Sequence, residues 1–312
     1  MSGLKILGTG RGLPQKAVSN DDLSRLVDTN DQWISTRTGI RQRYFCQEES
    51  CTDLAVLAAQ NALQKANIDP EKIGICLVAT FSPQYTTPST ACLVQAALGL
   101  SEETLCFDIN AACSGFIYAM ETARGLLQNC EKPYALIIGA EKVTRILDFT
   151  DRNTCVLFGD GAGAMVVQLS HEHKYSAIFG ARGSVEPISA GVLGDIDPLL
   201  KMDGKAIFRF ATEMIPANVR SVLQKAQMQP EELSWIVCHQ ANSRIIDFAA
   251  KKLGLPEEMF YKNMERYGNT SSASIPIALD EMWEQGLLKP GSTIVCVGFG
   301  AGLTWGAVLL TL

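Results

Sequence analysis

Cys113 is the residue of this sequence whose surroundings first indicate chemistry. It lies in the segment FDINAACSGFIYAM (residues 107–120), between small residues and at the start of an apolar pattern with helical spacing. The segment therefore predicts a strand-to-helix turn with the thiol at the mouth of a buried helix. There the helix dipole and unpaired backbone N–H groups favour the thiolate, which is the reactive form. The alternative is simple packing, because cysteine is often buried without a chemical role.

Three further motifs contain the partners that a thiol nucleophile needs. The imidazole of His239 follows an apolar segment in the sequence CHQAN, and the amide of Asn269 lies in the polar turn YGNTSSAS. The glycines of GFGAG (residues 298–302) allow backbone N–H groups to approach a ligand closely. Each motif alone also fits a core histidine or an ordinary turn. Together they are the parts that form and resolve an acyl-enzyme.

The elements that position these motifs alternate between strands and helices. Strands that are apolar on both faces imply sheets covered by helices. The pattern predicts strands at 3–10, 73–79, 105–109, 134–139 and 235–238, and helices at 19–27, 30–37, 52–66, 89–98 and 243–253.

The second half of the chain repeats the plan of the first. Val78 corresponds to His239 and Gly139 to Gly300, and both pairs are 161 residues apart. The same separation in two places indicates a duplicated unit. We therefore expect two similar α/β halves, residues 1–172 with the nucleophile and 173–312 with the imidazole and amide. They should pack as one compact unit with the site where they meet.

Composition limits the partners of the protein. With 312 residues, of which 47% are hydrophobic, the chain can bury a large core. Its net charge of −6 argues against general binding to nucleic acid or to an anionic membrane. The sequence contains neither an apolar run long enough to span a membrane nor a signal peptide, so we expect a cytoplasmic protein. The ten cysteines lack zinc-site spacing, so we expect no metal.

Taken together, the motifs resemble the β-ketoacyl-[acyl-carrier-protein] synthase III family of the thiolase superfamily. HQAN, GNTSSAS, FGDGAGA and the closing GLTWG carry the resemblance, which covers essentially the whole chain. It implies a thiolase-like α/β fold, in which duplicated halves form five layers (α-β-α-β-α), and a homodimer. It also implies that an acyl-CoA primer condenses with malonyl-acyl carrier protein (malonyl-ACP) to initiate fatty acid synthesis. The products would be 3-oxoacyl-ACP, CO₂ and CoA, formed through an acyl-Cys intermediate without a metal or redox cofactor.

The resemblance also assigns roles to individual residues. Cys113 matches the acylated nucleophile, and His239 and Asn269 match its two partners. The backbone N–H groups of Cys113 and Ala301 match the oxyanion hole; many relatives have glycine at the latter position, but alanine keeps the backbone donor. The residues that match contacts to coenzyme A and its pantetheine arm are Trp33, Arg37, Arg152, Met202, Gly204, Phe208, Ala241 and Asn242.

Two further positions concern the carrier protein and the primer. An acidic carrier requires a basic dock, for which the candidates are Arg209, Arg244, Lys251 and Lys252; an ordinary solvated helix face is the alternative. Thr87 stands where many relatives carry a bulky phenylalanine at the end of the acyl pocket, a position that reaches the partner subunit's site. A smaller residue suggests primers longer or more branched than acetyl, unless Phe81, Leu147 and Phe158 fill the space.

Related readings remain open. A 3-hydroxy-3-methylglutaryl-CoA synthase shares the fold and the cysteine but needs an acidic base, which the matched motifs lack. A type III polyketide synthase is typically longer and takes malonyl-CoA directly. Retention of all three matched side chains argues against a catalytically silent partner, and the papain-type motif of cysteine hydrolases is absent. The sequence names neither the primer nor the fate of the product.

Overall fold

The apolar strands of the first half form a five-stranded sheet in the order β1-β7-β6-β4-β5. β4 pairs in parallel with β5 and β6, whereas β6 and β7, and β7 and β1, are antiparallel. β5 is an edge strand. The strands are β1 (Gly3–Gly12), β4 (Ile73–Ala79), β5 (Leu105–Ile109), β6 (Tyr134–Glu141) and β7 (Gly161–Ser170). The computed structural model describes residues 2–191 and 198–312.

The second half forms a sheet of the same design. Its order is β11-β12-β13-β8, with one parallel pair followed by two antiparallel pairs, whereas the first sheet has two parallel pairs followed by two antiparallel pairs. A parallel bridge between Ile236 and Phe260 continues the β11 edge where the first sheet has β5. The strands are β8 (Tyr175–Ala181), β11 (Trp235–Cys238), β12 (Thr293–Gly300) and β13 (Thr304–Thr311). The repeated strand order confirms the predicted duplication.

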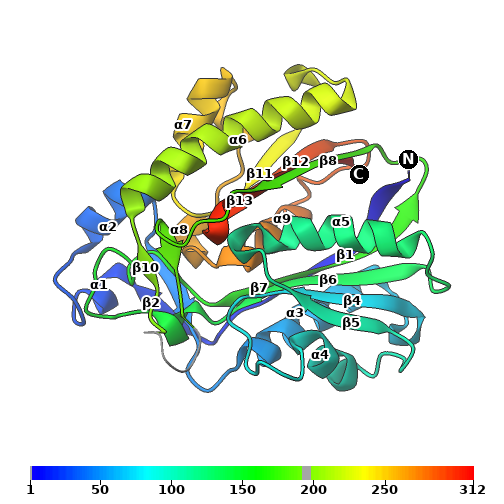
Figure 1. Ribbon diagram of the computed structural model, residues 1–312, viewed down its shortest axis with the longest axis horizontal. Helices are drawn as coiled ribbons and strands as arrows, with labels where there is room; N and C mark the ends of the chain where they lie inside the picture. The colour runs from blue at the N-terminus through cyan, green and yellow to red at the C-terminus, as the bar shows by residue number, and fades with distance from the viewer. Residues whose placement is uncertain (1, 192–197) are drawn as a thin grey trace.

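Helices cover both faces of both sheets (Figure 1). Two lie between the sheets and share one apolar core with them. Two cover the outer face of the first sheet and two that of the second, each pair with its own core. The helices between the sheets are α5 (Gly115–Leu127) and α9 (Ser274–Glu284). Those on the outer face of the first sheet are α3 (Cys51–Ala66) and α4 (Thr90–Leu98), and those on the outer face of the second are α6 (Gly204–Ala226) and α7 (Ser243–Leu253). These five layers confirm the predicted thiolase-like architecture.

Short elements gather at one end of the molecule, on the left in Figure 1. They include β2 (Lys16–Ser19), α1 (Asn20–Leu23), α2 (Asp31–Thr38), β3 (Gln42–Phe45), β9 (Ile188–Ser189), β10 (Lys201–Met202) and α8 (Met264–Tyr267). The 3-10 turns are η1 (Pro70–Lys72), η2 (Ala112–Ser114), η3 (Val143–Ile146), η4 (Pro230–Glu232), η5 (Glu257–Met259), η6 (Ser271–Ala273) and η7 (Ala301–Leu303).

The predicted elements agree with the observed ones to within two residues, except for the first helix. It was expected over 19–27, but α1 ends at Leu23. The Ser24 hydroxyl donates to the Asp21 carbonyl, which shows how a serine side chain competes for helical backbone groups.

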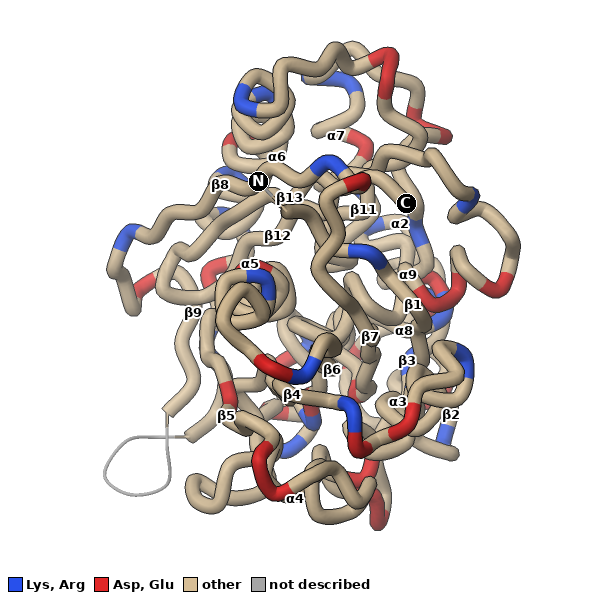
Figure 2. Tube along the Cα trace, turned by 90° about the vertical axis from the view of Figure 1, so that its right-hand side faces the viewer, with Lys and Arg blue, Asp and Glu red and all other residues tan. Residues whose placement is uncertain are grey.

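Charged residues of both signs lie close together on one side of the molecule (Figure 2). On the side that Figure 2 shows, basic and acidic residues are interspersed along the trace. Within the described residues, no helix is both long and apolar enough to cross a membrane.

Candidate active site

The Cys113 thiol lies at the start of the helix between the two sheets, as the sequence predicts. The chain leaves β5, makes the turn η2 and enters α5. Cys113 is only 8% exposed, yet it lines a cavity of about 530 Å³. The end of β12 lies against this turn, because a Cβ at Gly300 would be 2.7 Å from the Cys113 nitrogen. Only glycine permits that approach.

The charge state of the thiol differs from the expectation. Burial raises the pKa of Cys113 to about 12, and a hydrogen bond from the Ser271 hydroxyl to Sγ, 3.1 Å long, acts in the opposite direction. The resting form is therefore the thiol. The prediction that the helix terminus would favour the thiolate is wrong, because burial of Cys113 raises the pKa of its thiol.

His239 is held as a neutral imidazole. Its backbone N–H donates to the Val297 carbonyl, and its Nδ1 lies 2.7 Å from the Ser274 hydroxyl. That hydroxyl oxygen accepts the Gln240 N–H, so its own proton can be donated to Nδ1. The imidazole proton is then on Nε2. Burial lowers the pKa of His239 to about 3, which keeps the ring neutral.

Asn269 is fixed by both its backbone and its side chain. Its N–H donates to the Leu157 carbonyl, and its own carbonyl accepts from the Gly159 N–H. The side-chain Oδ1 accepts the Ser271 N–H at 2.9 Å. This bond assigns Oδ1 to the turn and leaves the Nδ2 group as the donor that Asn269 offers to the cavity.

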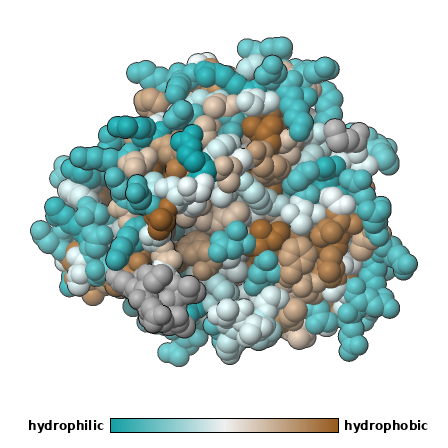
Figure 3. All heavy atoms as spheres, in the orientation of Figure 1, coloured by the Kyte–Doolittle hydropathy of each residue, from teal (hydrophilic) through white to brown (hydrophobic). Residues whose placement is uncertain are grey.

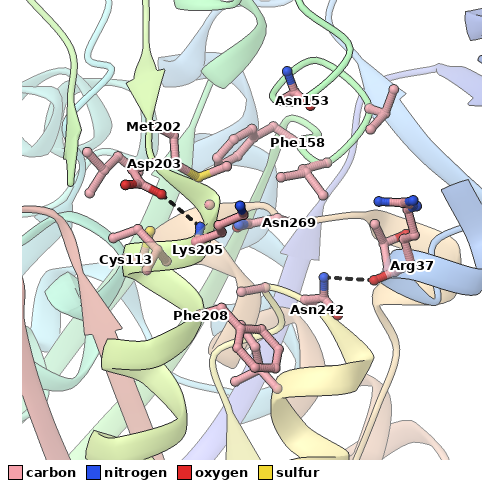
Figure 4. A pocket seen from close by; sticks show the side chains of 18 of the residues that line it. Arg37, Cys113, Asn153, Phe158, Met202, Asp203, Lys205, Phe208, Asn242 and Asn269 are labelled. Atoms are coloured by element: carbon pink, nitrogen blue, oxygen red, sulfur yellow. Dashed lines mark hydrogen bonds between the residues drawn. The ribbon is translucent and has the colours of Figure 1, made fainter.

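One cavity brings together the predicted nucleophile, its two partners and the predicted backbone donors. Figure 4 shows Cys113 and Asn269 on one side and Arg37 on the opposite side. The cavity-lining residues that the sequence predicts are Cys113, His239, Asn269 and Ala301, with Trp33, Arg37, Met202, Gly204, Phe208, Ala241 and Asn242.

Arg152 does not line this cavity, but it contacts Trp33, which does. Its guanidinium is 5.1 Å from the centre of the Trp33 ring, and that of Arg37 is 4.7 Å from the same ring. Arg152 also donates to the Asp28 carbonyl. An aromatic ring with two guanidinium neighbours is a suitable surface for stacking a planar group.

The residues predicted for the carrier protein lie outside the cavity. Arg244, Lys251 and Lys252 are exposed on α7, and Arg209 is exposed on the neighbouring α6. Between them lies Phe248, which is 45% exposed and which sequence reasoning missed. Its ring makes an edge contact with Phe208, a residue of the cavity.

The predicted acyl-pocket residue is not part of the cavity in the single chain. Thr87 is exposed and does not line it. Phe158 does line it, and packs in one cluster with Leu147 and the partly buried Phe81. Phe81, Leu147 and Phe158, the residues expected to fill space in the acyl pocket, therefore lie together.

Glu141 is a buried carboxylate that the sequence analysis overlooked. It accepts hydrogen bonds from the hydroxyls of Thr80, Ser82 and Ser272 and from two backbone N–H groups. Burial raises the pKa of Glu141 to about 7. It does not line the cavity, so it is not placed as the acidic base of a 3-hydroxy-3-methylglutaryl-CoA synthase.

Sequence signals could have found some of the missed residues. Ser271 and Ser274 lie inside the GNTSSAS motif, but their partners depend on the fold. Glu141 ends an apolar strand and shows no motif. Across residues 2–191 and 198–312, histidine, cysteine and acidic side chains form no group of three able to hold a metal ion.

Comparisons with known proteins all indicate one family. The family model of 3-oxoacyl-[acyl-carrier-protein (ACP)] synthase III matches residues 107–183. The model of the C-terminal part of the same family matches residues 223–312. The β-ketoacyl-[acyl-carrier-protein] synthase III of Clostridium acetobutylicum is 45% identical, over 99% of each chain. The crystal structure of 3-oxoacyl-[acyl-carrier-protein] synthase III from Aquifex aeolicus is 46% identical, with a TM-score of 0.95 over 99% of this chain and 100% of that one. A priming β-ketosynthase from a polyketide biosynthetic pathway is 34% identical, with a TM-score of 0.94 over 99% and 96%.

Proposed function

The chain belongs to the β-ketoacyl-[acyl-carrier-protein] synthase III family, and from this premise we propose that it condenses an acyl-CoA primer with malonyl-ACP. The products are 3-oxoacyl-ACP, CO₂ and CoA, and the reaction initiates fatty acid synthesis. The observation that carries this proposal is the meeting of one thiol, one neutral imidazole and one amide in a single cavity. We propose that the reaction takes place in the cytoplasm, together with the carrier protein.

In the first half-reaction, the Cys113 sulfur attacks the thioester carbonyl of acyl-CoA. The backbone N–H groups of Cys113 and Ala301 stabilise the tetrahedral oxyanion, with each donor contributing ~3 kcal/mol. The bond to the CoA sulfur then breaks, and the proton lost by the Cys113 thiol is balanced by the one that CoA gains. The acyl group remains on Cys113.

In the second half-reaction, malonyl-ACP loses CO₂ while its thioester oxygen becomes an enolate. The Nε2–H of His239 and the Nδ2 group of Asn269 donate to that oxygen. The tautomer of His239 follows from Ser274, and the orientation of Asn269 from Ser271. The carbanion attacks the acyl-Cys carbonyl, and Cys113 leaves as a thiolate. The two donors stabilise the enolate and the condensation transfers no electrons, so we propose that it uses no metal or redox cofactor.

The pantetheine arm of either substrate reaches Cys113 through the same cavity. Its mouth is bounded by Trp33 and Arg37, and its wall by Met202 and Phe208. We propose that Trp33 and Arg152, which lie against each other in the structure, flank the adenine of CoA.

The carrier protein docks on α7 and the adjacent part of α6. Arg244, Phe248 and Lys251 are four and three residues apart, so they share one exposed helix face. Two cations flank an apolar side chain there, a pattern that fits an acidic helix carrying an apolar residue. Phe248 also contacts Phe208, which connects the dock with the cavity.

The open edge of the first sheet supports our proposal of a homodimer. β5 ends the strand order, and its Leu105 is 46% exposed. Figure 3 shows apolar atoms gathered on this face, at the level of α5 and the first sheet. An exposed apolar edge strand is a template for pairing with a second copy. Such pairing would bring Thr87 towards the partner's cavity.

The direct test is product formation from acyl-CoA and malonyl-ACP, followed by mass spectrometry of the carrier protein. We expect 3-oxoacyl-ACP with wild-type protein, and its loss in His239→Ala and Asn269→Ala. Both variants should still acylate Cys113, because neither side chain is a donor of the oxyanion hole. Unchanged malonyl-ACP decarboxylation in either variant would refute the assigned roles. A panel of straight and branched acyl-CoA primers in the same assay identifies the preferred substrate.

A further inference from the structure

Backbone strain is concentrated around the Cys113 sulfur. Among the described residues, five that are not glycine have positive φ. Asn67 and Gln227 are ordinary left-handed caps that end α3 and α6. The others are Ala112, which precedes the nucleophile; Ser271, which contacts it; and Leu303, two residues after Ala301. Strained backbone persists where surrounding structure enforces it, and such residues cluster at functional sites.

Ser271 is the strained residue that touches the reacting atom. Its hydroxyl donates to Cys113 Sγ at 3.1 Å, and its side chain is fully buried. Its backbone N–H donates to Asn269 Oδ1. The same backbone conformation therefore aims a hydroxyl at the nucleophile and orients the amide of a second proposed catalytic group.

The next residue anchors the turn. The Ser272 hydroxyl contacts Glu141 Oε1 at 2.8 Å and the Ala79 carbonyl at 2.9 Å. Gly139 allows this turn to lie against β6, because a Cβ there would be 2.4 Å from the Ser272 carbonyl oxygen. These contacts hold Ser271 under the sulfur despite its φ of +50°.

The reaction places negative charge on the sulfur twice. Cys113 attacks as a developing thiolate during acylation, and it leaves as a thiolate when the carbanion displaces it. The sulfur is buried, and the neighbouring imidazole is neutral. A buried anion without a cationic partner requires hydrogen-bond donors.

We propose that Ser271 is a further catalytic residue, whose hydroxyl donates a hydrogen bond to Cys113 Sγ whenever that sulfur carries negative charge. This inference rests on the proposed function for its second step, the departure of the thiolate. Its first step concerns the free thiol alone. The Ser271 hydroxyl keeps its proton throughout. During alkylation the thiol proton of Cys113 goes to solvent, and during acylation its loss is matched by the proton that the CoA thiolate gains.

The test measures Cys113 alkylation by iodoacetamide as a function of pH, read by mass spectrometry of the Cys113 peptide. Ser271→Ala removes the hydroxyl and keeps the strain, whereas Ser271→Gly removes both. We expect both variants to react about tenfold to a hundredfold more slowly at neutral pH, with a higher apparent pKa. The matched control is Thr270→Val, because the Thr270 hydroxyl is buried in the same turn without a partner.

The outcomes separate this inference from the proposed function. An alkylation profile of Ser271→Ala that equals wild type, in protein with unchanged melting temperature, overturns the role of Ser271. A slowed reaction in Ser271→Ala with normal reactivity in Ser271→Gly also overturns it, because strain rather than the hydroxyl would then matter. Since alkylation uses no acyl-CoA and no carrier protein, failure of wild type to condense its substrates leaves this result unaffected.

Discussion

At the scale of single residues, the chemistry depends on protonation states that burial fixes. His239 is neutral because its ring is enclosed, and its Nε2–H tautomer follows from the Ser274 hydroxyl. Cys113 is a resting thiol for the same reason. A neutral imidazole and a thiol avoid a buried ion pair, so both reaction steps begin from uncharged side chains.

The neutral imidazole gives a clear pH prediction. An ordinary histidine titrates near 6.5, whereas the pKa of His239 is lowered to about 3. The ring therefore stays neutral at every pH above about 3. We expect the rate of malonyl-ACP decarboxylation to stay level from pH 8 to pH 5. An acidic limb centred near pH 6.5 that disappears in His239→Gln would contradict this account.

The three principal residues of the site could be predicted from the sequence. The motifs of Cys113, His239 and Asn269 each have an ordinary structural explanation, but together they predict one site, and all three residues line the cavity. The resting state of the thiol could not be predicted, since it depends on how completely the second half of the chain covers the sulfur. Ser271 and Glu141 were missed because a hydroxyl or a carboxylate acquires its partners only in the folded chain.

At the scale of elements, Glu141 joins the end of β6 to two turns. It accepts donors from the turn after β4, at Thr80 and Ser82, and from Ser272 in η6. The turn that carries Ser271 and Asn269 is thereby tied to the first sheet.

The stability of this arrangement should depend on pH. The pKa of Glu141 is raised from an ordinary 4.5 to about 7, so the folded state binds the proton more tightly than the unfolded state. The resulting stabilisation is complete below about pH 4.5 and is lost as pH rises through 7, a change of about 3 kcal/mol. We expect urea unfolding to show this loss in wild type and not in Glu141→Gln. Equal pH slopes for the two proteins would contradict it.

α7 provides a second prediction at this scale. Arg244→Glu and Lys251→Glu should raise the KM for malonyl-ACP and leave the KM for acyl-CoA unchanged. Increasing salt should weaken the wild-type interaction and reduce the difference between the proteins. Lys72→Glu, an exposed charge reversal on the turn before β4, is the control. Equal effects on both substrates would show that α7 is not the dock.

Elements were predicted well where hydrophobic periodicity is long and uninterrupted. β4, β11 and α7 have the expected bounds. α1 was predicted too long because the apolar positions continue beyond Leu23 while a serine side chain competes for the backbone. Short strands such as β9 and β10 were not predicted, since two residues carry no periodicity.

At the scale of the whole molecule, the site depends on duplication. The nucleophile follows a strand of the first sheet, and the imidazole and amide come from the second half. We propose that the halves meet between residues 172 and 173, because β7 ends at Ser170 and β8 begins at Tyr175. Two similar α/β halves could be predicted from the repeat, whereas the five layers were implied by the family resemblance. The pairing of β5 with a partner is a proposal.

The dimer should contribute to activity. Leu105→Asp places a charge on the exposed edge strand, so we expect monomers by light scattering and a large loss of condensation. Leu26→Asp is the matched control. Leu26 is also an exposed leucine, but it lies in the turn after α1 and not on the edge strand β5. A monomeric wild-type protein with full activity would exclude the dimer.

The central claim is that Cys113 carries the acyl group between the two substrates. Intact-mass spectrometry of the protein incubated with acyl-CoA alone tests it most directly. We predict a mass increase of one acyl group per chain, located on the Cys113 peptide, removed by later addition of malonyl-ACP, and absent in Cys113→Ala. An unmodified wild-type protein, or an adduct that persists in Cys113→Ala, would contradict the account.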